Sequence, residues 1–126
     1  MSASLVGSEM CIRDRGINVV TAQDTICDGF HLYGTGDPLD YGLVGCYCAQ
    51  YNTPEAARTM WNMLTKASAR VFDPEMKYGI EVGNDADLNL VEAPNVHDAI
   101  RTRASRPYII RHGKVIASFI RRAQLL

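Results

Sequence analysis

The sequence predicts an α/β fold, in which a buried strand leads into helices and a small β module follows. The run 16–22, GINVVTA, is short, apolar and β-branched, as in strands buried on both faces of a parallel sheet. Two helix-start signals come next, Asp37-Pro38 and Thr53-Pro54. From residue 78 onward, short apolar runs alternate with turn residues, which is typical of strands.

Composition bounds the class of protein. The chain has 126 residues, 47% hydrophobic and 21% charged, which suits one globular domain. A net charge of −1 gives no bulk attraction to nucleic acid or to a membrane. We find no membrane-spanning apolar run and no secretory signal. The four cysteines match no zinc pattern, so we expect them to be reduced and buried, which favours a cytoplasmic location.

The first fifteen residues, MSASLVGSEMCIRDR, continue no apolar period into the rest of the chain. They resemble the translated sequencing adapter found at broken ends of metagenomic gene fragments. We therefore interpret 1–15 as a non-native scar and expect the natural protein to extend upstream. A genuine flexible N-terminus is the alternative.

Two longer helices follow a glycine-containing loop that ends near Gly36. The helix after Asp37-Pro38 is apolar over most of its circumference, so we expect it to be buried on several sides by elements outside this chain. The helix after Thr53-Pro54 places one apolar face inward. That face comprises Ala57, Met60, Trp61 and Leu64. A short helix over 67–72 should end at Asp73-Pro74, because a residue before proline avoids the helical region.

The β module begins with alternation over 78–83 and a turn at Asn84-Asp85. A strand is predicted over 87–91, whereas 97–103 is polar and ambiguous. The runs 107–111 and 114–117 flank His112-Gly113, which predicts a hairpin with a two-residue turn in which the glycine supplies the positive φ.

Three stretches together resemble the metal-dependent amidohydrolase superfamily and, within it, the cytosine deaminases. The first is GINV through Gln23-Asp24, continuing to Asp28 and Gly34-Thr35. The second is YGIEVGNDADL at 78–88, with the pattern G-I-x-x-G-x-x-A-D-L, and the third is RHGKVIA at 111–117. The match covers 16–118, and the tail 119–126 is unexplained.

The resemblance implies the C-terminal end of a (β/α)₈ TIM barrel plus the C-terminal part of a small β-sandwich. Residues 16–77 would be the last barrel strand and helices, and 78–118 the sandwich strands. A complete barrel needs roughly 250 residues, so most of it would lie outside this chain.

Asp24 is the site residue that the resemblance implies, both as a metal ligand and as a catalytic carboxylate that moves a proton from the attacking water to the leaving amine. The cofactor would be a divalent metal ion, zinc or iron. The other ligands, all histidines, and a proton-donating glutamate would come from earlier strands that this chain lacks. From the residues alone, an aspartate after a strand is also a common helix cap or turn former. We expect His31, His97 and His112 to be exposed in loops or turns rather than to bind metal.

The loop after Asp24 departs from the cytosine deaminase pattern. Thr25 stands where the family usually has a second acidic residue, which leaves the exact substrate open. Phe30 is a candidate aromatic wall for a planar ring, or simply a packed loop residue. Thr25 and Phe30 are therefore substrate-binding candidates.

The expected function is hydrolysis of a carbon–nitrogen bond in a cyclic amidine, with cytosine deamination as the most specific interpretation. One alternative is an amidohydrolase acting on another heterocycle or a cyclic amide, and another is a non-catalytic interaction module. The expected partner is a small heterocyclic substrate, with neither nucleic acid nor membrane, and the full-length protein is a candidate homo-oligomer. The arginines near the end are expected to form a solvated face. We expect this chain alone to be inactive and poorly folded.

Overall fold

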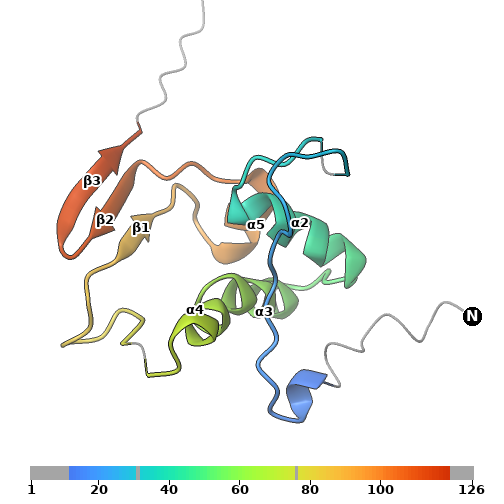
Figure 1. The fold of residues 1–126 in the computed structure, drawn as a ribbon, viewed down its shortest axis with the longest axis horizontal. Coiled ribbons are helices and arrows are strands. Elements are labelled where there is room, and N and C mark those ends of the chain that lie inside the picture. The colour runs from blue at the N-terminus through green and yellow to red at the C-terminus, as the bar shows by residue number, and fades with distance from the viewer. Residues whose placement is uncertain (1–11, 31, 76, 120–126) are drawn as a thin grey trace, which may run out of the picture.

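The computed structural model describes residues 12–30, 32–75 and 77–119. A group of helices lies beside a three-stranded antiparallel sheet (Figure 1). The helices whose bounds the structure describes are α2 (Pro38–Cys48), α3 (Pro54–Leu64), α4 (Lys66–Phe72) and α5 (Val96–Thr102). The strands are β1 (Leu88–Leu90), β2 (Tyr108–Arg111) and β3 (Lys114–Ser118).

Helices α2 and α3 begin where their capping signals predict. The Asp37 carboxylate accepts the Leu39 amide at 2.9 Å, and the Thr53 hydroxyl accepts the Ala56 amide at 3.2 Å. These bonds satisfy amide donors that have no partner within the first helical turn. The predicted helix starts are confirmed, as is the end of α4 before Asp73-Pro74.

The core lies where α2, α3 and α5 meet. Leu39, Met60 and Ile100 form its buried cluster, and Met60 is only 1% exposed. The predicted inward face of α3 is confirmed, because Ala57 and Met60 are buried while Trp61 and Leu64 pack against the cluster. Gly42 of α2 permits this approach, since a β-carbon there would lie 2.6 Å from Leu64 Cδ1.

Part of the surface of α2 is not covered within the described residues. The side chains of Val44 and Tyr47 are 58% and 74% exposed. Helix α2 packs on α3 and α5 but leaves these apolar side chains exposed, and their burial by elements outside this chain stays a prediction. The apolar character that produced the prediction is present, but no described element lies over it.

The predicted strand over 16–22 does not form within the described residues. The segment is extended but joins no sheet, and Ile17 is 55% exposed. A strand requires backbone hydrogen bonds to a neighbour, and no described segment offers them. Instead, the Asn18 amide donates to the Ala67 carbonyl at 2.9 Å, and Thr21 lies close to Gly45. The segment thus runs across the helical group (Figure 1).

The sheet has the order β1-β2-β3, with Leu88 opposite Ile110 and Arg111 opposite Lys114. The predicted hairpin is confirmed, and both turn residues have positive φ, 47° at His112 and 73° at Gly113. This is the backbone of a type I′ turn, which matches the twist of the paired strands. The strand predicted over 87–91 is confirmed as β1.

The alternating run 78–83 is not a strand, contrary to its period. It forms bends and turns in which Gly79 and Gly83 have φ of 128° and 94°. The Asn84 side chain donates to the Gly79 carbonyl at 3.2 Å, closing the segment on itself. Local turn geometry therefore outweighs the alternation. The ambiguous segment around 97–103 forms helix α5.

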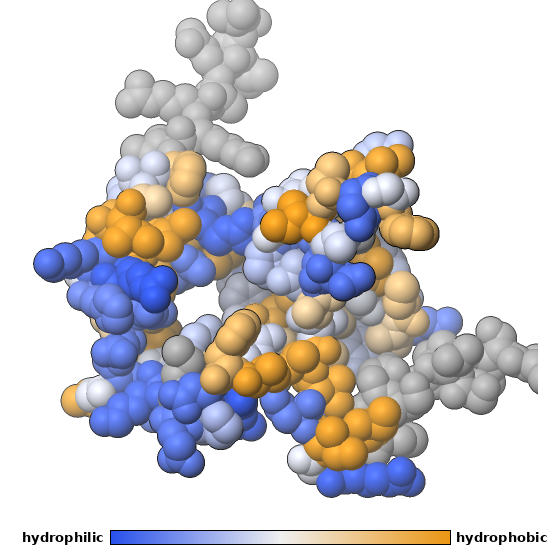
Figure 2. Space-filling model, in the orientation of Figure 1, coloured by the Kyte–Doolittle hydropathy of each residue, from blue (hydrophilic) through white to orange (hydrophobic). Residues whose placement is uncertain are grey.

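The sheet packs on none of the described helices. Apolar side chains remain on its surface, seen in orange at the left of Figure 2. Leu90, Tyr108, Val115 and Ile116 are each at least 40% exposed. Among the described residues, no helix combines the length and hydropathy needed to cross a membrane.

Candidate active site

Asp24 lies at the end of the extended segment, where the chain turns into a loop. Its carboxylate is exposed and makes no hydrogen bond or ion pair with any other described residue. It is thus neither a helix cap nor part of a buried salt bridge. An exposed, unpaired carboxylate at the end of an extended segment suits a metal ligand, and the assignment itself stays a prediction.

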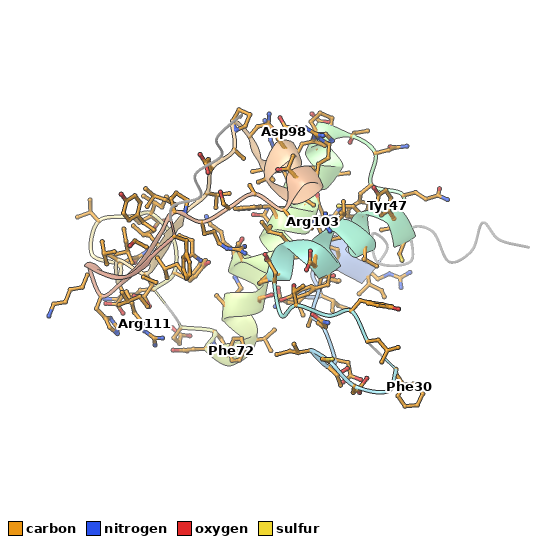
Figure 3. All side chains as sticks on the ribbon, turned by 90° about the horizontal axis from the view of Figure 1, so that it is seen from above. Phe30, Tyr47, Phe72, Asp98, Arg103 and Arg111 are labelled. Atoms are coloured by element: carbon orange, nitrogen blue, oxygen red, sulfur yellow. The ribbon has the colours of Figure 1, made fainter. Side chains whose placement is uncertain are left out.

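Thr25 and Phe30 lie on the same loop as Asp24. Thr25 is half-buried, whereas the Phe30 ring is fully exposed at 102% and projects from the loop tip (Figure 3). The Phe30 amide donates to Asp28 Oδ1 at 2.8 Å, which shapes the turn at the tip. Phe30 is therefore not a packed loop aromatic, and its predicted contact with a substrate stays a prediction.

The loop closes on itself beside Asp24. The backbone of Gly34 lies so near the outgoing limb that a β-carbon would be 1.9 Å from the Ile26 carbonyl oxygen and 2.3 Å from Gln23 Nε2. Only glycine fits at this approach. The returning limb of the loop therefore contacts the residue immediately before Asp24.

An ion-pair network holds the far end of the loop. The Arg106 guanidinium donates two hydrogen bonds to the Asp37 carboxylate, one of them 2.9 Å long from Nη1 to Oδ1. The Thr35 hydroxyl donates to Asp40, which also lies 3.7 Å from Arg103 Nη1. Partial burial raises the pKa of Asp37, but hydrogen bonds from Arg106 and the Leu39 amide outweigh it and hold the pKa below its ordinary value.

Sequence reasoning found Asp37 as a helix cap but missed its pairing with Arg106. The two residues are 69 positions apart, and the sequence alone predicts that Arg106 lies with the other arginines on a solvated face. Arg106 is in fact only 26% exposed. No local signal identifies such a partner, because the pairing depends on how α5 packs on α2.

The described histidines do not form a metal centre. His112 lies in the hairpin turn and is exposed as predicted, at 66% for its side chain. His97 is also exposed, but it lies on α5 rather than in a loop. His31 lies outside the described residues. No group of three metal-binding side chains occurs in the described part of the chain.

A divalent metal therefore fits this chain only in part. Asp24 offers one free carboxylate, whereas tight binding needs three or four protein ligands. The additional ligands would have to come from outside the described residues. This is the arrangement that the predicted resemblance implies.

The cysteines correct one expectation. Cys27 and Cys48 are exposed rather than buried, because the loop and the second side of α2 lack a cover. Cys46 is half-buried, and that burial raises the pKa of its thiol. Cys11 lies outside the described residues.

A cavity of about 540 Å³ opens between α2 and α5. Leu43, Tyr47 and Ile100 contribute apolar surface, and none of the predicted site residues lines it. It brings together no acid–base pair of the kind that hydrolysis needs, so it is not the candidate active site.

The motif that carries the resemblance has a structural role. Asp87 Oδ1 accepts the His112 amide at 2.7 Å, and the Ala86 carbonyl accepts the Gly113 amide at 3.1 Å. The end of G-I-x-x-G-x-x-A-D-L thus holds the β2–β3 turn in place. The motif stabilises the module and contributes no reactive group.

Comparison with known proteins gives a consistent result. The chain is 34% identical over 103 residues to N-isopropylammelide isopropyl amidohydrolase of Pseudomonas sp. (strain ADP). It is similar in structure to 5-methylcytosine deaminase of Klebsiella pneumoniae, with a TM-score of 0.83 at 29% identity over 94% of this chain. N-isopropylammelide isopropylaminohydrolase of Burkholderia multivorans gives a TM-score of 0.80 at 26% identity over 88% of this chain. No protein-family model matches.

The predicted resemblance is confirmed, since these relatives are enzymes of the amidohydrolase superfamily, whose fold contains a TIM barrel. The described residues themselves have an α/β fold with a small antiparallel sheet. The chain spans 26% of the length of the curated relative and 29% of the 5-methylcytosine deaminase chain.

Proposed function

We propose that this chain is the C-terminal part of a metal-dependent amidohydrolase that removes an exocyclic amino group from a small nitrogen heterocycle. The observation that carries the proposal is the likeness of most of this chain to hydrolases acting on two such ring systems, combined with a free carboxylate at Asp24. Cytosine deamination, giving uracil and ammonia, is the most specific form of the proposal.

Asp24 is the catalytic and metal-binding residue of this proposal. Asp24, with ligands from outside the described residues, would hold a divalent metal, zinc or iron, which would supply a water of lowered pKa near neutral pH. The Asp24 carboxylate would accept a proton from the attacking water and deliver it to the departing nitrogen. The water oxygen would bond to the ring carbon as the carbon–nitrogen bond breaks, and the amine would leave with the proton.

The uncovered surfaces support a place at the end of a barrel. Segment 16–22 is extended without a strand partner among the described residues, and Val44 and Tyr47 lie exposed on α2. Both features suit a last barrel strand and helix whose neighbours belong to the rest of a longer protein. Residues 78–118 would likewise complete a β-sandwich, because their sheet packs on no described helix.

The residue after Asp24 bears on which of two substrate classes the enzyme takes, a cytosine-like ring or an alkylamino heterocycle. An acidic side chain after Asp24 would pair with ring N–H groups, whereas Thr25 offers only a neutral hydroxyl. The curated relative at 34% identity is named for N-isopropylammelide, which favours an alkylamino heterocycle as the second candidate. In both, the exposed Phe30 ring would stack on the substrate once the rest of the enzyme is present.

The test is to recover the upstream reading frame from the same DNA and to purify the whole product. It would be offered cytosine, 5-methylcytosine and N-isopropylammelide, after chelation and after adding back zinc or iron. Metal-dependent amine release from any of them supports the proposal, and the preferred substrate decides between the two classes. An upstream frame without histidines, or a metal-loaded protein that hydrolyses none of the three, contradicts it.

A further inference from the structure

We infer that the Arg106–Asp37 ion pair is a clamp that positions the loop 23–36, and that Arg106 is therefore a positioning residue for the site at Asp24. The inference rests on the proposed function for its catalytic consequence. Its structural part stands on contacts within this chain. Arg106 touches neither Asp24 nor the exposed face of Phe30, so it acts through the loop.

The clamp has the geometry of a strong ion pair. Both terminal nitrogens of the Arg106 guanidinium, Nη1 and Nη2, donate to the two oxygens of Asp37, and the side chains are only 26% and 22% exposed. Two parallel charge-assisted bonds fix the relative orientation of the groups as well as their distance. Partial exclusion of water makes the pair stronger than an exposed surface pair.

The clamp reaches Asp24 through the returning limb of the loop. Asp37 is the last residue before α2, and its amide donates to the Thr35 hydroxyl at 3.1 Å. Thr35 follows Gly34, whose backbone packs against the Gln23 side chain and the Ile26 carbonyl. A shift of Asp37 is thus passed by direct contact to the residues on either side of Asp24.

The clamp also joins the loop to the β module. Arg106 lies two residues before β2, in the linker that leaves α5. The same linker carries Arg103, which lies 3.7 Å from Asp40 on the first turn of α2. The sheet contacts no described helix, so these two ion pairs connect the path into β2 to the start of α2, where the loop ends.

The experiment uses the full-length protein with Arg106→Gln and Asp37→Ser. Serine keeps the helix cap, because its hydroxyl accepts the same Leu39 amide, but it removes the partner of Arg106. Arg101→Gln is the matched control, since Arg101 also makes two hydrogen bonds to an aspartate, Asp98, but within α5 and away from the loop. Arg106→Lys retains the charge without the two-pronged geometry.

Kinetics give the first readout. We expect Arg106→Gln and Asp37→Ser each to raise KM roughly tenfold with kcat changed less than about threefold, and the double variant to be no worse than either. Arg106→Lys should fall in between, and Arg101→Gln should match the wild type. The inference is overturned if all variants, including Arg101→Gln, lose kcat and gain KM to the same extent. It is also overturned if the KM increases of the two single variants multiply in the double variant.

Limited chymotrypsin digestion gives a second readout that needs no activity. Phe30 and Tyr33 are exposed cleavage sites on the loop. Loss of the clamp should speed cleavage at these sites about fivefold or more relative to sites elsewhere, with no change in Arg101→Gln. Unchanged loop cleavage overturns the clamp even in an active enzyme. Faster loop cleavage in a protein that hydrolyses no heterocycle supports the clamp while the proposed function fails.

Discussion

The carboxylate of Asp87 accepts the backbone amide of His112 at 2.7 Å, across 25 residues of sequence. This contact joins the start of β1 to the turn between β2 and β3, so all three strands share one anchor. The aspartate before the final leucine of the G-I-x-x-G-x-x-A-D-L motif therefore has a physical reason. A side chain with two acceptor oxygens next to a strand pins the turn of the neighbouring hairpin.

Replacing Asp87 with alanine should loosen that turn. We expect a loss of about 1 kcal/mol in the free energy of unfolding, the usual net value of such a hydrogen bond. Urea unfolding monitored by circular dichroism measures it. Asp85→Ala is the control, because Asp85 is exposed and its side chain has no partner among the described residues. Equal effects of both substitutions would show that the Asp87 contact is not an anchor.

Replacing Gly34 with alanine should open the loop that follows Asp24. The added β-carbon would lie 1.9 Å from the Ile26 carbonyl oxygen, a backbone atom that cannot move aside by changing a side-chain rotamer. Overpacking of this kind costs about 1–3 kcal/mol. Gly29→Ala is the matched control on the same loop, since a β-carbon there meets nothing within 4 Å. Chymotrypsin cleavage after Phe30 should speed up in the first variant alone, and equal rates in both would refute this packing.

The Arg106–Asp37 clamp should make stability fall in acid. The pKa of Asp37 is held below 3.8, so the pair stabilises the fold fully above that value. The contribution is lost as pH falls through the lowered pKa, when the carboxylate takes up a proton. We expect the wild type to exceed Asp37→Ser by about 1 kcal/mol near pH 7. Urea titrations from pH 7 to about pH 2 should show that gap closing, and a gap that widens in acid contradicts the assignment.

The isolated 126-residue chain should self-associate through the uncovered side of α2. Val44 and Tyr47 expose apolar surface that soluble monomers rarely leave contiguous. The double substitution Val44→Lys with Tyr47→Lys should raise the concentration at which light scattering appears. Gln50→Lys adds the same kind of charge just beyond the helix and serves as the control. A wild-type chain that stays monomeric with a sharp thermal transition would contradict this expectation.

Local signals account for the features that the sequence predicted correctly. Asp37-Pro38 and Thr53-Pro54 each contain both the cap and the first helical residue, so no distant partner is needed. The hairpin follows equally from His112-Gly113, whose backbone takes positive φ at both positions. These elements depend on residues within a few positions of each other.

Missing or distant partners, and in one segment local turn geometry, account for the features that the sequence missed. Residues 16–22 have the composition of a strand but no neighbouring strand among the described residues. Without that neighbour, their backbone groups lack the hydrogen bonds that define a strand. Residues 78–83 alternate like a strand, yet Gly79 and Gly83 turn the chain. The clamp between Asp37 and Arg106 depends on helix packing, which no short pattern encodes.

The central claim is that Asp24 binds metal and moves a proton, and substitution in the full-length protein tests it most directly. Asp24→Asn keeps the size of the side chain but removes its charge and basicity, and Asp85→Asn is the exposed control. Metal content by elemental analysis and amine release would be measured on the same preparations. We predict that Asp24→Asn loses at least about a hundredfold in kcat, the scale of a lost general base, and binds metal more weakly, while Asp85→Asn matches the wild type. Full activity and full metal content in Asp24→Asn would contradict the account.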